Sequence, residues 1–103
     1  MFEITKNAAN QINLAASQSD VSGMSIRIAV IKKPDGSLDY RMGYDESKSH
    51  DIKVVPNDIE VIFTPNYENL LKGTLMDYVE LEPGKFNFIF MNPNDANYTP
   101  PQD

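Results

Sequence analysis

The segment from Gly73 to Asn94 constrains the fold most, because its pattern predicts two strands joined by a tight turn. Pro83-Gly84 supplies the turn, since proline presets a negative φ and glycine accepts a positive one. Phenylalanine then recurs at every second position, at Phe86, Phe88 and Phe90. Alternate residues of a strand share one face, so all three rings are expected to point into the core. Burying each ring contributes roughly 1.5–3 kcal/mol.

The rest of the chain predicts further short strands and two helices. A helix is expected from Lys6 to Ser17 with Thr5 as its N-cap, and a short one from Pro65 to Gly73. An Asp-Gly turn at 35–36 joins two stretches of period-two alternation into a hairpin. The expected strands cover 2–4, 24–31, 38–44, 52–55, 59–63 and the two arms of the Gly73–Asn94 hairpin. This pattern indicates an α+β fold, a twisted and mostly antiparallel β-sheet of six or seven short strands with two packed helices.

The length and composition favour one folded domain. A chain of 103 residues with 41% hydrophobic residues suits a single modest core. We expect residues 1–94 to form that domain. Residues 95–103 hold two prolines and no aliphatic residue larger than alanine, which predicts a flexible C-terminal tail. No apolar run approaches 18 residues, and the N-terminus lacks the apolar core of a signal peptide, so a cytoplasmic location without membrane association is expected.

The charge distribution argues against nucleic acid as the main ligand. The net charge is −6, and residues 56–103 carry eight carboxylates against only Lys72 and Lys85. Binding to phosphate backbones needs a basic face. The one local basic spot is Lys32-Lys33, beside the predicted turn, and a solvated hairpin end explains it more simply than a nucleic-acid site.

Two other groups of side chains carry little chemical signal. His50 is the only histidine, and its acidic neighbours in sequence are better explained as solvated loop residues than as metal ligands. An oxygen-rich stretch at residues 92–97 lacks the glycine and closing glutamate of a calcium loop. No phosphate loop, catalytic triad or paired carboxylates are recognisable, so no catalytic residue is assigned.

Several segments resemble the A-type iron–sulfur carrier family, which includes IscA, SufA and HesB. The similar segments are Ile4-Thr5-x-x-Ala8-Ala9, Ile26-Arg27-Ile28-Ala29-Val30, Gly73-Thr74-x-x-Asp77-Tyr78-Val79 with the alternating phenylalanines, and Asn92-Pro93-Asn94. Together they span nearly the whole chain. The resemblance implies a HesB-like fold, and it implies binding of iron or an iron–sulfur cluster through three cysteines in that family.

This chain contains no cysteine. Alignment with the family places Asp35, Thr99 and Pro101 at the three ligand positions. Clusters are held by thiolates, threonine is a poor ligand, and proline has no side-chain donor. We therefore expect no cofactor, no metal site and a colourless protein. The alternative that remains open is that Asp35 contributes to an oxygen-ligand site for iron or another metal.

The resemblance extends to cysteine-free members associated with the dissimilatory sulfite reductase system of sulfur-oxidising bacteria. It implies a non-enzymatic accessory protein that acts through protein–protein contacts in sulfur oxidation or iron–sulfur metabolism. In the family the predicted turn and the tail meet at the cluster site, so Lys32, Lys33 and Asp35 form a candidate interaction patch. Its expected partners are sulfur-metabolism or iron–sulfur assembly proteins. An uncharacterised enzyme is the remaining alternative.

Overall fold

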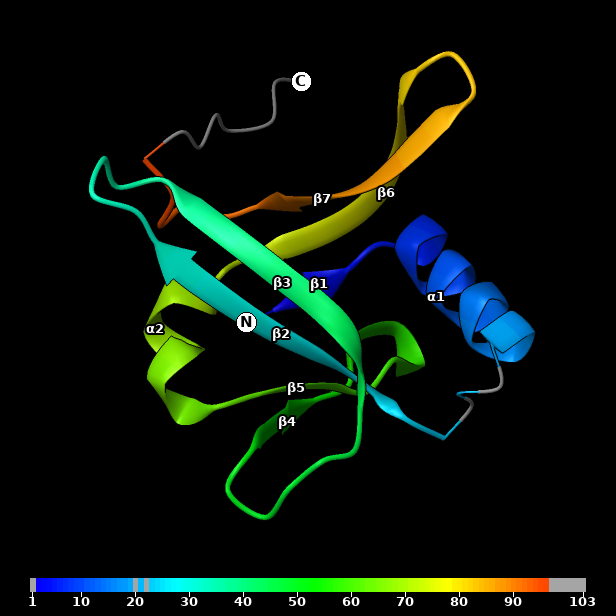
Figure 1. The fold of residues 1–103 in the computed structure, drawn as a ribbon, viewed down its shortest axis with the longest axis horizontal. Coiled ribbons are helices and arrows are strands. Elements are labelled where there is room, and N and C mark those ends of the chain that lie inside the picture. Colours follow the sequence, from blue (N-terminus) through cyan, green and yellow to red (C-terminus); the bar gives the residue numbers. More distant parts are fainter. Residues whose placement is uncertain (1, 20, 22, 97–103) are drawn as a thin grey trace.

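A computed structural model describes residues 2–19, 21 and 23–96 of the chain. Seven strands, two α-helices and two short 3₁₀ helices follow one another along this part of the sequence (Figure 1). In chain order they are β1 (Glu3–Ile4), α1 (Lys6–Ser19), β2 (Ser25–Lys32), β3 (Leu38–Asp45), β4 (Ile52–Val54), η1 (Pro56–Asp58), β5 (Val61–Phe63), η2 (Pro65–Tyr67), α2 (Glu68–Leu71), β6 (Leu75–Glu82) and β7 (Lys85–Met91).

The strands form two sheets. One has the order β1-β6-β7 and the other the order β3-β2-β5-β4. The hairpins β2–β3, β4–β5 and β6–β7 are antiparallel, whereas β1 runs parallel to β6 and β5 runs parallel to β2. The predicted α+β class, mostly antiparallel pairing and two α-helices are confirmed. The division into two sheets was not predicted, because alternation identifies strands but not their distant partners.

Helix α1 begins as the sequence predicts. The Thr5 hydroxyl oxygen accepts a hydrogen bond from the Ala8 amide at 3.2 Å, which caps the first turn. The same hydroxyl donates to Asp77 of β6 at 2.6 Å, so the cap also ties the helix start to the three-stranded sheet. The helix buries Ala8, Ala9 and Ile12. Two of the three buried side chains are alanines, so Ile12 is the one large aliphatic residue that the helix buries.

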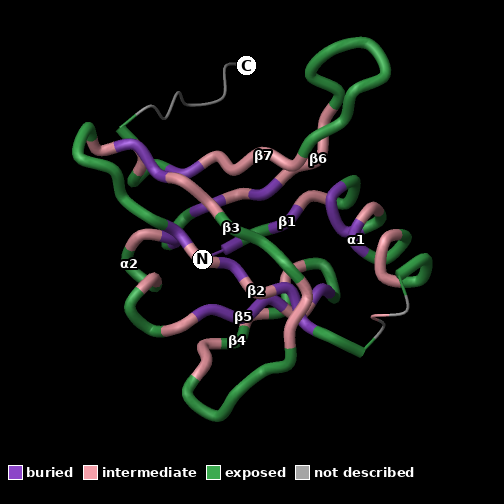
Figure 2. The backbone as a smooth tube through the Cα atoms, viewed as in Figure 1, coloured by how far each residue is buried: buried purple, intermediate pink, exposed green. Residues whose placement is uncertain are grey.

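The core lies between the two sheets and beneath α1 (Figure 2). One face of β2 is almost completely buried, with Ile28 at 0% and Val30 at 2% relative exposure. Met76 of β6 and Leu71 of α2 complete the centre of the cluster. No helix in the described part of the chain is long and apolar enough to cross a membrane.

The far end of the β6–β7 hairpin differs from the expectation. Phe86 is 51% exposed, so the prediction that all three rings are buried is wrong for this one. Phe88 and Phe90 are half-buried and contact Tyr78 and Tyr40, with ring centroids 4.8 and 4.2 Å apart. The cause is visible in Figure 2, where the tip of the hairpin extends beyond the body of the domain and is exposed.

Candidate functional site

The turn between β2 and β3 is held by its own side chains. Gly36 adopts a φ of +89°, as the Asp-Gly pattern requires. One carboxylate oxygen of Asp35 accepts hydrogen bonds from the Ser37 hydroxyl at 2.6 Å and the Ser37 amide at 2.9 Å. These bonds hold the pKa of Asp35 below its usual range. The turn is therefore a defined structure that presents exposed Lys32, Lys33 and Asp35.

Asn92 fixes the end of β7 to two other elements. Its side chain is buried, and its amide nitrogen donates to the Tyr40 hydroxyl at 3.0 Å and to the Leu70 carbonyl at 2.6 Å. Its side-chain oxygen accepts from the Asn94 amide at 2.9 Å. Asn94 in turn donates to the Lys72 carbonyl at 3.0 Å, which satisfies a carbonyl at the end of α2. The Asn-Pro-Asn sequence thus sets the direction in which the chain leaves the sheet.

The chain leaving this point returns to the β2–β3 turn. The Asp95 amide donates to the Asn92 carbonyl at 3.0 Å, and the Ala96 amide donates to the Gly36 carbonyl at 3.2 Å. The contact is close enough that a Cβ on Gly36 would lie 3.1 Å from the Ala96 Cβ. The turn and the first tail residues therefore meet, as the resemblance implied.

Of the three positions that align with the family's cluster ligands, only Asp35 belongs to the described residues. Thr99 and Pro101 lie outside them, and so does most of the predicted tail. The chain offers no thiolate, and Asp35 already accepts two hydrogen bonds within the turn. In residues 2–19, 21 and 23–96 no group of three histidine or carboxylate side chains is placed to hold a metal ion. The donor set does not fit an iron–sulfur cluster.

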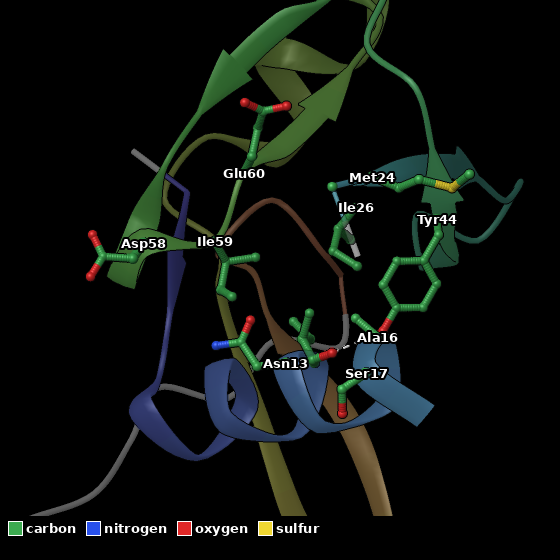
Figure 3. Close-up of a pocket in the computed structure, with 11 residues that line it drawn as sticks. Asn13, Ala16, Ser17, Met24, Ile26, Tyr44, Asp58, Ile59 and Glu60 are labelled. Atoms are coloured by element: carbon green, nitrogen blue, oxygen red, sulfur yellow. Dashed lines mark hydrogen bonds between the residues drawn. The ribbon is translucent and has the colours of Figure 1, made fainter. Parts of the chain in front are cut away.

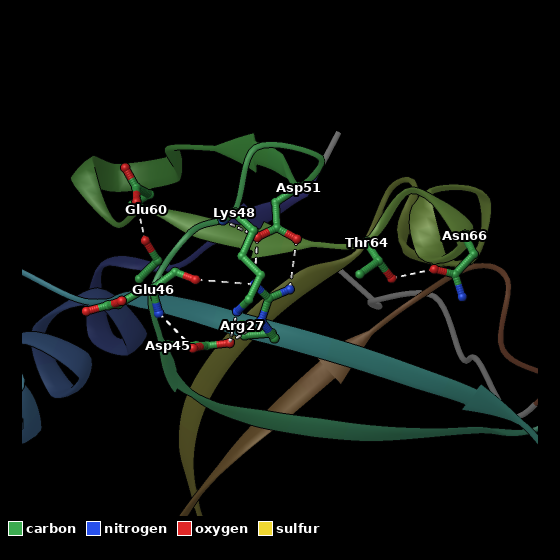
Figure 4. A network of polar contacts seen from close by, with 9 residues as sticks. Arg27, Asp45, Glu46, Lys48, Asp51, Glu60, Thr64 and Asn66 are labelled. Carbon is green, nitrogen blue, oxygen red and sulfur yellow. Dashed lines mark hydrogen bonds and ion pairs between the residues drawn. The ribbon is translucent and has the colours of Figure 1, made fainter.

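A charged network on the outer face of β2 was not found by sequence reasoning (Figure 4). Arg27 bonds Asp51 with both terminal nitrogens, at 2.9 and 2.6 Å, and its Nε donates to Asp45 at 2.6 Å. Asp51 also accepts from the Lys48 amide at 2.7 Å. The Arg27 bonds, supported by backbone amides, hold the pKa of both carboxyls below their usual range. The network fastens loop 46–51 over the sheet, and the acidic neighbours of His50 take part in it.

The cavity in Figure 3 lies between α1, the start of β2 and the approach to β5. Its volume is about 320 Å³, and Ile12, Ala16, Ile26 and Ile59 supply most of its apolar wall. The Tyr44 hydroxyl at its edge donates to the Ile12 carbonyl at 3.0 Å, and the Glu60 carboxylate accepts from Ser25. The Tyr44 hydroxyl and the Glu60 carboxylate are thus both engaged in bonds within the protein.

Comparisons with known sequences find distant relatives, one of them named for iron–sulfur cluster assembly. A mitochondrial iron–sulfur cluster assembly 1 homologue from Dictyostelium discoideum is 26% identical over 100 residues, which are 94% of this chain and 71% of that protein. A protein from Aquifex aeolicus (strain VF5) is 26% identical over 95 residues, or 91% of this chain and 81% of the relative. No protein-family model matches the chain.

Solved structures share the fold. The crystal structure of IscA with a 2Fe–2S cluster has a TM-score of 0.78 at 24% identity, covering 93% of this chain and 88% of that one. Escherichia coli SufA, involved in the biosynthesis of iron–sulfur clusters, has a TM-score of 0.76 at 21% identity, covering 96% and 86%. An Aquifex aeolicus protein solved by NMR has a TM-score of 0.66 at 25% identity, covering 89% and 91%. The chain thus shares the fold of IscA and SufA, and it contains no cysteine.

Proposed function

We propose that this chain is a non-enzymatic accessory protein of the cytoplasm that acts through protein–protein contacts. Its working surface is the end of the domain where the β2–β3 turn meets the segment after Asn94. Its setting is sulfur oxidation or iron–sulfur metabolism, in a role like that of DsrR, a cysteine-free protein of the dissimilatory sulfite reductase system. Its partners are proteins of those systems, and its function requires no bound cofactor.

The observation that carries this proposal is the contact between Gly36 and Ala96. The two segments that would surround a cluster in the relatives still meet here, although the chain has no thiolate to bind one. Hydrogen bonds of the buried Asn92 and of the turn residue Asp35 hold the two segments in these positions. Docking of a partner gives a reason for keeping this arrangement without a cluster.

We call Lys32, Lys33 and Asp35 the turn patch. All three residues are exposed, and the patch is small and mixed in charge. A surface of this kind suits a transient contact whose association rate falls as salt screens the charges. Residues 95 and 96 extend the patch, because they lie against the turn through the Ala96–Gly36 bond.

The first test is anaerobic reconstitution of the purified protein with ferrous iron and sulfide. The expected product is colourless and shows no stoichiometric cluster absorption, because the chain has no thiolate. Iron titration without sulfide examines the alternative site on Asp35, with the Asp35→Ser variant as control. Two results would contradict the proposal. One is a stable form that absorbs visible light; the other is stoichiometric iron binding by the native protein that the Asp35→Ser variant lacks.

The second test replaces the turn patch and removes the tail. The variant carries Lys32→Ser, Lys33→Ser and Asp35→Ser and ends at residue 94. A matched control carries Lys6→Ser, Glu82→Ser and Lys85→Ser, exposed residues of the same charges on α1 and the β6–β7 tip. We expect the first variant to lose its partners in pull-downs from the native host and to impair sulfur oxidation there. Unchanged partners and sulfur oxidation in a stably folded variant would refute the assignment.

A further inference from the structure

Gly43 occupies an interior position of β3 that does not require glycine. The β2–β3 register is continuous from Ser25 to Asp45, so there is no bulge at Gly43, which pairs with Arg27. Gly43 does not adopt a positive φ, and a Cβ built on it would meet no atom within 4 Å. Glycine weakens a strand interior, and where neither bulge nor bend explains it, it often marks the close approach of another backbone.

The surroundings of Gly43 leave room for such an approach. A shallow hollow of about 250 Å³ lies here, with Arg27, Ala29, Arg41 and Gly43 among its lining residues. Ala29 pairs with Arg41 and Gly43 pairs with Arg27, so the two small residues are diagonal neighbours on one face of the hairpin. Two residues further along β2 on that face, Ile31 is 53% exposed. β3 is also an edge strand, with β2 as its only strand neighbour in the described part of the chain.

The charge of this region differs from that of the whole chain. Residues 29–43 hold three cations, Lys32, Lys33 and Arg41, and two carboxylates, in a chain of net charge −6. Both carboxylates have partners, because Asp35 accepts from Ser37 and Asp39 lies 3.3 Å from Arg41. The Arg41 side chain remains 71% exposed. Residues 29–43 carry a net charge of +1 against −7 for the rest of the chain, and Asp45, which also lines the hollow, is bound by Arg27. An acidic partner is therefore favoured here over other parts of the surface.

We propose that the outer face of the β2–β3 hairpin docks an extended acidic segment of a partner protein. The segment's backbone lies over Ala29 and Gly43, its carboxylates face Arg41 and Lys33, and an apolar side chain covers Ile31. This rests on the proposed function in one respect, that the protein works through protein contacts. It adds the chemistry of the partner and extends the contact surface from the turn patch along the sheet.

The probe is a fluorescein-labelled peptide, Ser-Glu-Ser-Ile-Ser-Glu-Ser-Gly, whose two glutamates and isoleucine share one face when the peptide is extended. It is compared with the same peptide carrying glutamine in place of glutamate. Binding is followed by anisotropy at low salt and mapped by amide chemical shifts. We expect the acidic peptide to bind at least about tenfold more tightly than the glutamine peptide, a difference of about 1.4 kcal/mol. The shifted amides should lie in residues 29–33 and 39–43. Equal binding of the two peptides, or shifts confined to other elements, would overturn the proposal.

The decisive variant is Gly43→Val. Valine suits a strand interior, so the melting temperature should rise by about 3–6 °C, yet peptide binding should weaken at least about tenfold because the side chain fills the approach. Asn87→Val, at an exposed position of β7 paired with Val79, is the matched control and should leave binding unchanged. Tight binding by Gly43→Val would refute the docking surface.

The same variant separates this inference from the proposed function. If the turn-patch variant loses its host partners while Gly43→Val keeps them, the proposed function stands and the docking face is refuted. If both variants lose the partners that the Asn87→Val control retains, both are supported. If only Gly43→Val loses them, the docking face stands and the turn patch is refuted. If neither variant loses a partner, both proposals are wrong.

Discussion

The two long hairpins have comparable apolar patterns and different burial. Apolar or aromatic residues recur at every second position in β2, β3 and β7, and at Met76 and Tyr78 in the first half of β6. In β2 the stripe is buried along its length, with Ile28 at 0% exposure. In β6–β7 burial fades along the hairpin, from Met76 at 0% to Phe86 at 51%. An apolar stripe indicates which face of a strand turns inward, but it does not indicate where along the strand the core ends.

The difference follows from what covers each hairpin. The inner face of β2–β3 packs on residues from α1, α2 and the other sheet, and loop 46–51 is fastened over part of its outer face by Arg27. Near the tip of β6–β7, Phe86 stacks on Tyr78 of the same hairpin with ring centroids 5.6 Å apart, and both rings border a hollow beside Leu14 of α1. Stability should therefore be concentrated in β2–β3 and at the proximal end of β6–β7.

The largest expected effect is at the buried centre of β2. Ile28→Ala removes a fully buried side chain and should lower the free energy of unfolding by about 2–5 kcal/mol, through lost burial and the cavity left behind. Urea unfolding followed by circular dichroism measures the change, with the conservative Ile28→Val as control. A loss below about 1 kcal/mol for alanine would show that β2 is not the centre of the core.

The next effect concerns the proximal end of β7. Asn92→Ala removes the buried side chain that bonds Tyr40, Leu70 and Asn94, and should cost about 1–3 kcal/mol because buried polar partners lose their bonds. Asn94→Ala, at an exposed position, is the control and should cost less. Equal costs for the two variants would contradict the role given to Asn92. Broadened amide signals at Gly36 and Ala96 would report the loosened tail.

A smaller, pH-dependent effect on stability is expected at the ion pair between Arg27 of β2 and Asp51. Hydrogen bonds from Arg27 and the Lys48 amide hold the pKa of Asp51 below its usual range. Its ionised form therefore stabilises the fold above the unfolded-state pKa of about 3.9, and this contribution is lost as pH falls through the folded-state pKa. Asp51→Asn should be less stable than the native chain at pH 7, and the gap should narrow below about pH 4.

Melting temperatures measured between pH 2 and 7 test this linkage. Asp58→Asn, at an exposed position, is the control for a lost carboxylate. A gap between Asp51→Asn and the native protein that stays constant down to pH 2 would argue against the ion pair in Figure 4 as its source.

The smallest effect is expected at the tip of β6–β7. Phe86→Ala removes a ring that is half exposed, so the cost should be about 1 kcal/mol, near half the value for full burial. The same urea measurement places it beside Ile28→Ala. A cost equal to that of Ile28→Ala would abolish the contrast between the hairpins and show that the tip is packed in solution.

The candidate site was predictable in part. Asp35-Gly36 indicated the turn by local chemistry, and its resemblance to a cluster-binding loop indicated that the tail would meet it. The Arg27 network could not be found in this way, because Asp45 and Asp51 lie 18 and 24 residues from Arg27. Their meeting depends on the path of a loop, which alternation and turn signals do not specify. Gly43 was visible in the sequence, but only its register with Arg27 showed that glycine is not required there.

By itself the sequence determined the local elements and the limits of the chemistry. Strand alternation, the Thr5 cap and the turn glycines depend on backbone preferences of neighbouring residues, and the lack of cysteine removes thiolate ligands at any position in the fold. The tertiary structure alone decided the division into two sheets, the exposure of Phe86 and the bonds of Arg27 to Asp45 and Asp51. These depend on contacts between distant residues, whose pairing is set by how the whole chain covers its apolar faces.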